Sequence, residues 1–446
     1  MKPWWFWRVV RRVAIGLLSL AVLYMATVAV YRWRGPTQVQ RDALASMQER
    51  ARPQNGVNAF PLLWYMQYDV PDGELDGRMA AEVADVKERL AHDSEAFSHE
   101  PAADKLKEAG GDTSVLCESI SAGCLAKVSA DPRSIQDALA TFPTMRAREA
   151  AFEQANFYWN EFPADYRIML AGHHGVAQRI WLSAFALQFV EGDRSGALAG
   201  VCRNIDTWRR VRQGTNSSIG SMVAIGQADG GMHLFAEMLA ALPEDEEVPP
   251  ECTQALRPIE VADTDRCVEM SNLFALAANT SRDMKAMRDR EPWWTRAFDW
   301  LFFDEEQTNA WRAEQFAIYC GDSATKRMLA DIPLSEGATP MITRRVECIA
   351  SLTGCILDDI AAPIYARYDS RTLDFLAHLR LASTLLAMRE SGSDESIAVR
   401  FENESDSQRS RRRNSGFDRE KGVLFVDNLD SKRGTRFELP VPRRSR

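Results

Sequence analysis

Histidine is scarce in this chain, with six residues among 446. The sequence also lacks the His-Glu-x-x-His motif of zinc proteases, the Gly-x-Ser-x-Gly motif of serine hydrolases, a glycine-rich phosphate-binding loop with lysine, and an EF-hand loop. These absences move the expectation away from the common hydrolases, and we expect no cofactor and no metal. The composition, 46% hydrophobic and 26% charged, excludes a collagen-like, low-complexity or wholly disordered chain.

Basic residues are in deficit over most of the chain. The formal net charge is −9, although residues 1–34 contain six basic side chains and no acidic one. The rest of the chain is therefore more acidic than the net charge indicates. Because an acidic body repels phosphate backbones, we do not expect a general nucleic-acid-binding protein.

Charge is missing altogether from residues 13–31, which form a run of 19 positions. This length is close to the roughly 20 residues that cross the hydrocarbon layer as a helix. Aromatic residues that favour the membrane interface lie at both ends of the run: Trp4, Trp5 and Trp7 before it, Tyr31 as its last residue and Trp33 after it. We expect a single transmembrane helix. A cleaved signal peptide is the alternative, but its apolar core is usually only about 7–15 residues long.

The flanking charges predict the orientation of this helix. Lys2, Arg8, Arg11 and Arg12 precede the run together with the amino terminus, whereas three basic residues follow it, namely Arg32, Arg34 and Arg41. By the positive-inside rule, residues 1–12 are expected to be a short cytoplasmic tail and the bulk of the chain to be periplasmic, anchored in the inner membrane. Eight cysteines in the long segment that follows suit an oxidising compartment and support the same orientation.

The cysteines carry the most specific pattern. Cys117 and Cys124 are separated by six residues, and Cys348 and Cys355 repeat that spacing, with a glycine before the second cysteine of each pair. A glycine at that place permits a sharp turn that brings the two sulfur atoms together, so we expect two local disulfides. A metal site and free buried thiols are the alternatives, although zinc sites prefer shorter spacings.

The other four cysteines allow three connectivities. We favour Cys202 with Cys252 and Cys267 with Cys320, because this pairing ties successive helices together. The sequence alone does not separate it from the other two.

Helical patterns dominate from about residue 131. Asp131 followed by Pro132 is typical of a helix start, and Gly192-Asp193 of a helix end followed by a new start. We expect helices at 133–158, 165–191, 194–213, 217–242, 250–257, 264–288, 304–320, 323–331, 343–352 and 356–390. A helical repeat and a non-repetitive bundle are both compatible with this order, since no repeat period recurs with the same side chains.

After residue 391 the pattern changes to short alternating segments near 397–401, 422–426 and 436–439, which predict strands. Two arginine runs lie there, at 409–413 and 443–446. We expect them to be solvated, with contact to anionic lipid or nucleic acid as the alternative.

The predicted fold class is mainly α. A transmembrane helix precedes a large disulfide-stapled helical bundle or irregular helical-repeat ectodomain, which ends in a small β appendix. The expected divisions after the cytoplasmic tail are the membrane helix at 13–31, the first part of the ectodomain at 35–130, the helical core at 131–391, and the appendix with its basic tail at 392–446.

Three segments of the sequence resemble uncharacterised single-pass, membrane-anchored helical envelope proteins of Gram-negative bacteria. They are 186–198, 307–315 and 379–389. The resemblance implies an envelope location and a helical architecture, and it brings no catalytic residue with it.

The best candidate for a polar site combines His173 and His174 on one expected helix with Asp229 and His233 on another. Asp229 and His233 are four residues apart and share a helix face. A metal ion or a general base could be assembled there if the helices met. Because His173 lies on an apolar helix face, a buried and hydrogen-bonded core histidine is the simpler account.

Pairs of carboxylates for glycosidic cleavage can also be nominated, such as Glu149 with Glu153 or Asp304 with Glu305. None is distinguished by its spacing, because the separations that define such sites arise only in the fold.

Aromatic side chains crowd residues 293–303. The six are Trp293, Trp294, Phe298, Trp300, Phe302 and Phe303. A core element is the simplest interpretation, and a partner-binding surface, a dip into the outer leaflet of the inner membrane and a sugar-stacking platform are the alternatives. We expect Trp293 or Trp294 to be exposed, and take these two with Trp300 as a candidate interaction surface.

These observations together predict an inner-membrane-anchored periplasmic protein that works through binding rather than covalent chemistry. Its expected partner is another envelope protein, which it would serve as a scaffold, an assembly factor or an immunity-type binder. The alternative is a cell-envelope hydrolase acting on glycan or peptide, with a site among the acids or the His173 and His233 group.

Overall fold

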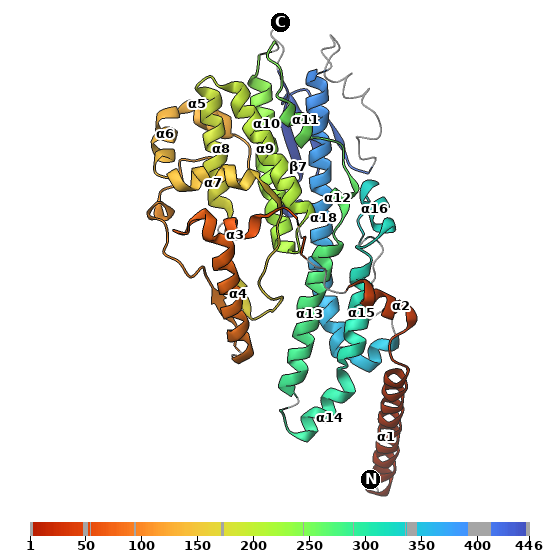
Figure 1. Ribbon diagram of the computed structural model, residues 1–446. Coiled ribbons are helices and arrows are strands. Elements are labelled where there is room, and N and C mark those ends of the chain that lie inside the picture. The colour runs from red at the N-terminus through yellow and green to blue at the C-terminus, as the bar shows by residue number, and fades with distance from the viewer. Residues whose placement is uncertain are drawn as a thin grey trace. The chain divides into compact units, whose positions relative to one another are not determined.

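The chain is mainly helical with few strands, as the sequence predicts (Figure 1). The computed structural model describes residues 3–47, 52–53, 55–92, 95–170, 174–243, 245–288, 290–334, 336, 346–390 and 412–442. Two compact units are distinguished. Unit 1 comprises Met1–Glu49, Phe274–Ile318 and Ser335–Ala366, and unit 2 comprises Arg50–Leu273, Tyr319–Leu334 and Arg367–Arg446.

Unit 1 includes the N-terminal apolar helix. Its elements are α1 (Pro3–Arg34), α2 (Gln38–Ser46), α14 (Trp293–Phe302), α15 (Glu305–Ala317) and η3 (Val346–Ser351), with the part of α13 (Cys267–Arg288) from Phe274 and the part of α18 (Leu352–Glu390) up to Ala366. Helix α2 packs on α15, whereas η3 packs on both α1 and α14. Thr37 caps α2 and forms a capping box with Gln40, which satisfies backbone donors at the helix start.

Within the part of the chain that the structure describes, two helices are long and apolar enough to cross a membrane by length and composition. The segment Phe6–Arg34 has a mean hydropathy of 2.4 with 6% of its window buried, and Cys348–Glu390 has a mean hydropathy of 1.3 with 40% buried. Only the first has apolar side chains exposed along nearly its whole length.

Unit 2 has a core of three successive helices. These are α8 (His174–Val190), α9 (Arg194–Gln213) and α10 (Ser218–Ala241), and each packs on the other two. Gly192 adopts a left-handed conformation at φ 106°, and the Asp193 side chain accepts a hydrogen bond from the Gly196 amide, so the predicted break between α8 and α9 is confirmed. Trp181, Trp208 and Phe152 stack in the interior.

Shorter helices surround this core. They are α3 (Ala59–Trp64), η1 (Asp72–Glu74), α4 (Leu75–His92), η2 (Lys107–Gly110), α5 (Cys124–Ala130), α6 (Pro132–Ala140), α7 (Pro143–Glu153), α11 (Pro250–Ala255), α12 (Val261–Thr264), α16 (Asp322–Leu329) and η4 (Ser431–Arg433). The expectation of one helix over 133–158 was wrong, because Pro143 begins a new helix and residues after 153 form a strand.

The strands are short, and those in the described ranges form three small sheets. β1 (Val57–Asn58) pairs in parallel with β3 (Ala155–Phe157), and β2 (Phe97–His99) with β4 (Ile168–Leu170). The helix expected from residue 165 therefore begins only at His174. In the appendix, β5 (Ser415–Asp418), β6 (Val423–Asp427) and β7 (Arg436–Pro440) form an antiparallel sheet, and β7 packs on α10. The strand expected at 397–401 lies outside the described residues.

The eight cysteines form four pairs at disulfide distance, and the pairs are those expected from the sequence. The Cα separations are 5.0 Å for Cys117–Cys124, 4.8 Å for Cys202–Cys252, 4.7 Å for Cys267–Cys320 and 5.8 Å for Cys348–Cys355.

The two glycines before the local disulfides play different roles. Gly123 has φ 96° and turns the chain immediately before α5, as expected. Gly354 instead lies inside α18 and has no left-handed conformation. A Cβ atom there would overlap the Thr308 side chain of α15, so this glycine permits close helix packing. The turn expected at Gly354 was wrong.

Arg413 corrects the expectation of a solvated arginine run. Its guanidinium is buried, lies 2.7 Å from Asp331 and also pairs with Asp374 of α18. This ion-paired cluster fixes the start of the C-terminal sheet within unit 2. Residues 409–411 and 443–446 lie outside the described residues.

Loop length predicts which disulfides of unit 2 matter more for stability. Replacing Cys202 and Cys252 with alanine removes a closure across 50 residues and is expected to cost about 4 kcal/mol, against about 2.5 kcal/mol for Cys117 and Cys124, which close seven residues. Urea unfolding of the two double variants, followed by circular dichroism, measures the difference. Equal losses would contradict the loop-entropy argument.

Candidate functional site

The C-terminal third of α1 is held against α14 and η3 within unit 1. The Tyr24 hydroxyl lies 3.2 Å from the Leu301 carbonyl oxygen and 3.1 Å from that of Ile349. One turn further along, Val28 is fully buried. Arg32 donates a hydrogen bond to the Phe303 carbonyl at 2.8 Å and pairs with Asp304 at 3.3 Å. These contacts fix the register of α1 along its neighbours, and Figure 1 shows α14 beside α1.

The tryptophans of α14 are exposed, in line with the expectation for Trp293 and Trp294. Their exposed fractions are 70% and 61%, and that of Trp300 is 46%. Phe303, by contrast, is buried, and Phe302 packs near Tyr24 with ring centroids 5.9 Å apart. Phe303 therefore belongs to the core, whereas the three tryptophans form an exposed surface of single large apolar side chains.

A charged groove of about 640 Å³ lies next to this surface. It is lined by Arg32, Leu44, Lys285, Arg288, Arg296, Asp299, Trp300, Phe303, Asp304, Glu305, Glu306 and Asn309. Opposite charges neutralise each other inside it, since Arg288 pairs with Asp299 at 2.6 Å and Lys285 with Glu305 at 3.5 Å. The Arg32 guanidinium also lies over the Trp300 ring, 4.8 Å from its centroid.

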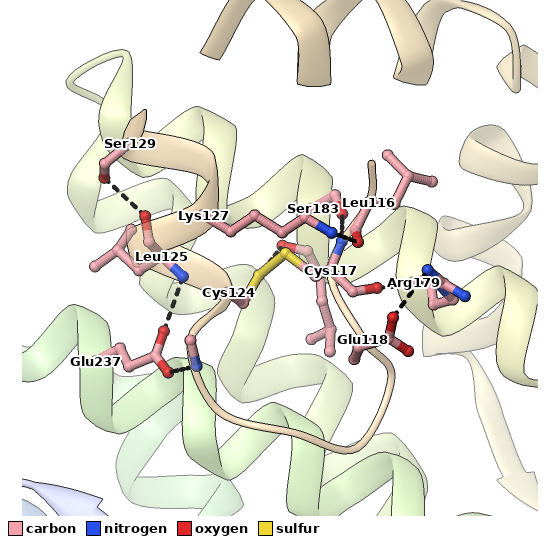
Figure 2. The surroundings of a disulfide bond; sticks show 12 residues. Leu116, Cys117, Glu118, Cys124, Leu125, Lys127, Ser129, Arg179, Ser183 and Glu237 are labelled. Atoms are coloured by element: carbon pink, nitrogen blue, oxygen red, sulfur yellow. Dashed lines mark hydrogen bonds and ion pairs between the residues drawn. A yellow bond between two sulfur atoms is a disulfide. The ribbon is translucent and has the colours of Figure 1, made fainter. Parts of the chain in front are cut away.

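In unit 2, the Cys117–Cys124 disulfide closes a loop that is held on several sides (Figure 2). The Glu237 carboxylate of α10 accepts hydrogen bonds from the amides of Gly123 and Leu125. Burial raises the pKa of Glu237, and these two amides oppose that shift. The Cys117 amide donates a hydrogen bond to the Ser183 hydroxyl. Arg179 donates to the Cys117 and Thr113 carbonyls, and Lys127 donates to the Leu116 carbonyl.

The same loop lies directly on α10. A Cβ atom at Gly230 would collide with the Ser119 carbonyl, so only glycine allows this approach. Ile120 follows at the tip of the loop and is 53% exposed. The structure therefore presents an isoleucine on a backbone that has little freedom to move.

Of the candidate histidine site, the structure describes the side chains of Asp229 and His233. Asp229 contacts His378 of α18, with 2.8 Å between Oδ1 and Nδ1, and the other ring nitrogen of His378 lies 2.8 Å from the Asn428 side chain. His378 and His233 both pack on Phe437 of β7.

This arrangement joins α10, α18 and the C-terminal sheet in the interior. His173 lies outside the described residues, and the side chain of His174 is likewise not described. Among the described residues, no group of three histidine, cysteine or carboxylate side chains could hold a metal ion.

The nominated carboxylate pairs have local roles. Asp304 caps α15 by accepting a hydrogen bond from Gln307, in addition to its ion pair with Arg32. Glu153 pairs with Arg203 at 2.9 Å. Glu149 lies one turn before Glu153, and burial together with the Glu153 charge raises its pKa to about 7.

The sequence analysis did not identify three residues that the structure places at the sites described above. Tyr24 is one uncharged residue within an apolar run, Ile120 is one aliphatic residue within a loop, and His378 lies 149 positions from Asp229. The close Cys117–Cys124 spacing is the one signal that could have drawn attention to Ile120.

Glu149 predicts a pH dependence of stability. Because its folded pKa of about 7 exceeds the unfolded value, the folded state binds more protons between these values, and stability is lost as pH rises through that interval. Glu149→Gln is expected to stabilise the protein at pH 8 by on the order of 2 kcal/mol and to have little effect at pH 4. Thermal unfolding across this range tests it, with Asp137→Asn on the surface of α6 as control. Parallel curves for wild type and Glu149→Gln would contradict it.

Comparison with protein-family models, with curated proteins and with solved structures found no match.

Proposed function

We propose that the chain is a single-pass inner-membrane protein whose bulk lies in the periplasm and which acts by binding another envelope protein. The observation that carries the proposal is α1, a continuous helix with a 19-residue uncharged run whose apolar side chains are largely exposed. Exposed apolar side chains along a whole helix are costly in water and favourable in a bilayer.

The second helix that is long enough to cross a membrane, α18, has the features of a core helix instead. In its unit 2 part, α18 buries Asp369, Asp374 and His378. Asp374 pairs with Arg413, and His378 with Asp229. Buried charged residues that are paired with neighbouring elements are typical of a helix inside a folded unit, so α1 is the proposed single anchor.

The disulfide-closed loop of unit 2 supports a binding role. An exposed apolar side chain on a rigid backbone favours association, because little conformational entropy is lost when the partner docks. Ile120 meets this condition, since the loop is closed by Cys117–Cys124 and fixed to α8 and α10. The acidic body would favour a partner with a basic surface.

The topology is tested with reporters fused after residue 446 of the full chain. Alkaline phosphatase is expected to be active there, and a fluorescent reporter that matures only in the cytoplasm is expected to be dark. The same pair fused after residue 12 provides the control and is expected to give the opposite result. Active phosphatase after residue 12 together with inactive phosphatase after residue 446 would refute the proposed orientation.

The binding role is tested by a photo-reactive p-benzoylphenylalanine in place of Ile120 in the full chain in native membranes. One discrete cross-linked species of higher mass is expected. Val261, an exposed aliphatic residue of α12, is the matched control position and is expected to give none. Ile120→Ser is expected to weaken the association by about 1–2 kcal/mol with the melting temperature unchanged, as for a loop-tip anchor. Equal adducts at both positions would refute the assignment.

A further inference from the structure

We infer that unit 1 is seated in the outer leaflet of the membrane, with α14 and the first turns of α18 facing lipid beside α1. The inference rests on the proposed role of α1 as the membrane anchor, and it assigns the exposed tryptophans to the bilayer rather than to a protein partner.

The position of Tyr24 along α1 determines how deep this residue lies in the bilayer. Arg32 is the first charged residue after the uncharged run, and Tyr24 lies eight residues before it, or about 12 Å along the helix axis. The outer half of the hydrocarbon layer is about 15 Å thick. If α1 spans the membrane with Arg32 at the outer boundary, Tyr24 lies within the outer leaflet.

Two other segments reach this depth because they contact Tyr24. The Tyr24 hydroxyl lies within 3.2 Å of the Leu301 carbonyl in α14 and of the Ile349 carbonyl in η3. A contact at the level of the bilayer brings both elements into the leaflet together with α1. Their outer surfaces must then suit lipid.

The outer surface of α14 meets that requirement. Trp293, Trp294 and Trp300 are exposed, and indole rings favour the boundary between headgroups and acyl chains. Asp299 of α14 pairs with Arg288 at 2.6 Å, and Arg296 is exposed on the same helix as the tryptophans. A short helix with exposed tryptophans and a basic side chain is typical of an interfacial segment, because the cation can reach anionic headgroups.

The outer surface of the first turns of α18 also suits lipid, and this observation is independent of α14. Leu352, Ile356 and Ile360 recur at every fourth position and are exposed, Ile360 by 68%. The neighbouring Asp358 is buried and pairs with Arg312 at 2.8 Å. The Asp358 side chain thus points into unit 1, and Asp359 is half-buried at the edge of the stripe. The three aliphatic side chains face outward on the helix that directly follows η3.

The test uses the full chain in proteoliposomes of phosphatidylethanolamine and phosphatidylglycerol that contain an alkyne-tagged phospholipid. A photo-reactive p-benzoylphenylalanine replaces Trp293, Ile360, Leu18 or Ile219, one per preparation. Leu18 reports on α1 itself, and Ile219 of α10 is exposed by 68% like Ile360 but lies in unit 2. Lipid adducts at Trp293 and Ile360 are expected to exceed those at Ile219 by about five-fold or more, and to be similar to those at Leu18.

The outcomes separate the two proposals. Strong labelling of Leu18 with background labelling of Trp293 and Ile360 would overturn the seating of unit 1 and leave the anchor intact. Background labelling of Leu18 would overturn the anchor itself. Adducts between Trp293 and a second copy of the chain, or between Trp293 and another protein in native membranes, would assign this surface to a protein contact and overturn the inference.

Discussion

Backbone carbonyl groups at helix ends and in irregular segments must find donors inside the protein, and buried arginines supply many of them here. Arg148 of α7 donates to four carbonyls of the segment after α3, those of Tyr65, Met66, Tyr68 and Val70. Arg209 of α9 donates to the carbonyls of Ala255, Arg257 and Pro258 and pairs with Asp263 at 2.5 Å. A planar group with five donors can satisfy several carbonyls at once, so irregular connections are held against the helical core without secondary structure of their own.

These interactions explain the limits of what the sequence could predict. The helices α9 and α10 were expected within one residue of their observed ends, because their caps, Asp193 and Ser217, are adjacent to them in sequence. The two local cysteine pairs also followed from their spacing, whereas the pairing of the other four cysteines was favoured among three that the sequence leaves open. A buried arginine has no such local signal, and Arg413 was therefore expected in solvent although it pairs with Asp331 across 82 residues. The short parallel strands escaped for the same reason, since their partners lie far away in sequence.

The candidate sites also divide into features with a local signal in the sequence and features that depend on distant residues. The exposure of Trp293 and Trp294 could be expected, because six aromatic side chains in eleven positions exceed what one helix face can bury. The contact between Asp229 and His378 of α18 could not be expected, because the two residues lie 149 positions apart in the sequence. Sequence periodicity identifies which residues share a face of a helix, whereas the neighbour of that face is decided by the packing of distant elements.

The Cys348–Cys355 disulfide stabilises the segment that contacts Tyr24 of α1. Ile349, whose carbonyl lies 3.1 Å from the Tyr24 hydroxyl, directly follows Cys348, and the disulfide ties η3 to the first turn of α18 beside the buried Trp311. The bond therefore closes the element on which α1 rests. A disulfide of this kind forms in an oxidising compartment, so the packing of η3 against α1 would be completed only after this segment has crossed the membrane. Under the proposed topology, the Cys348–Cys355 disulfide forms only after η3 and the start of α18 have been exported. The position of α1 along η3 therefore depends on the export of that segment.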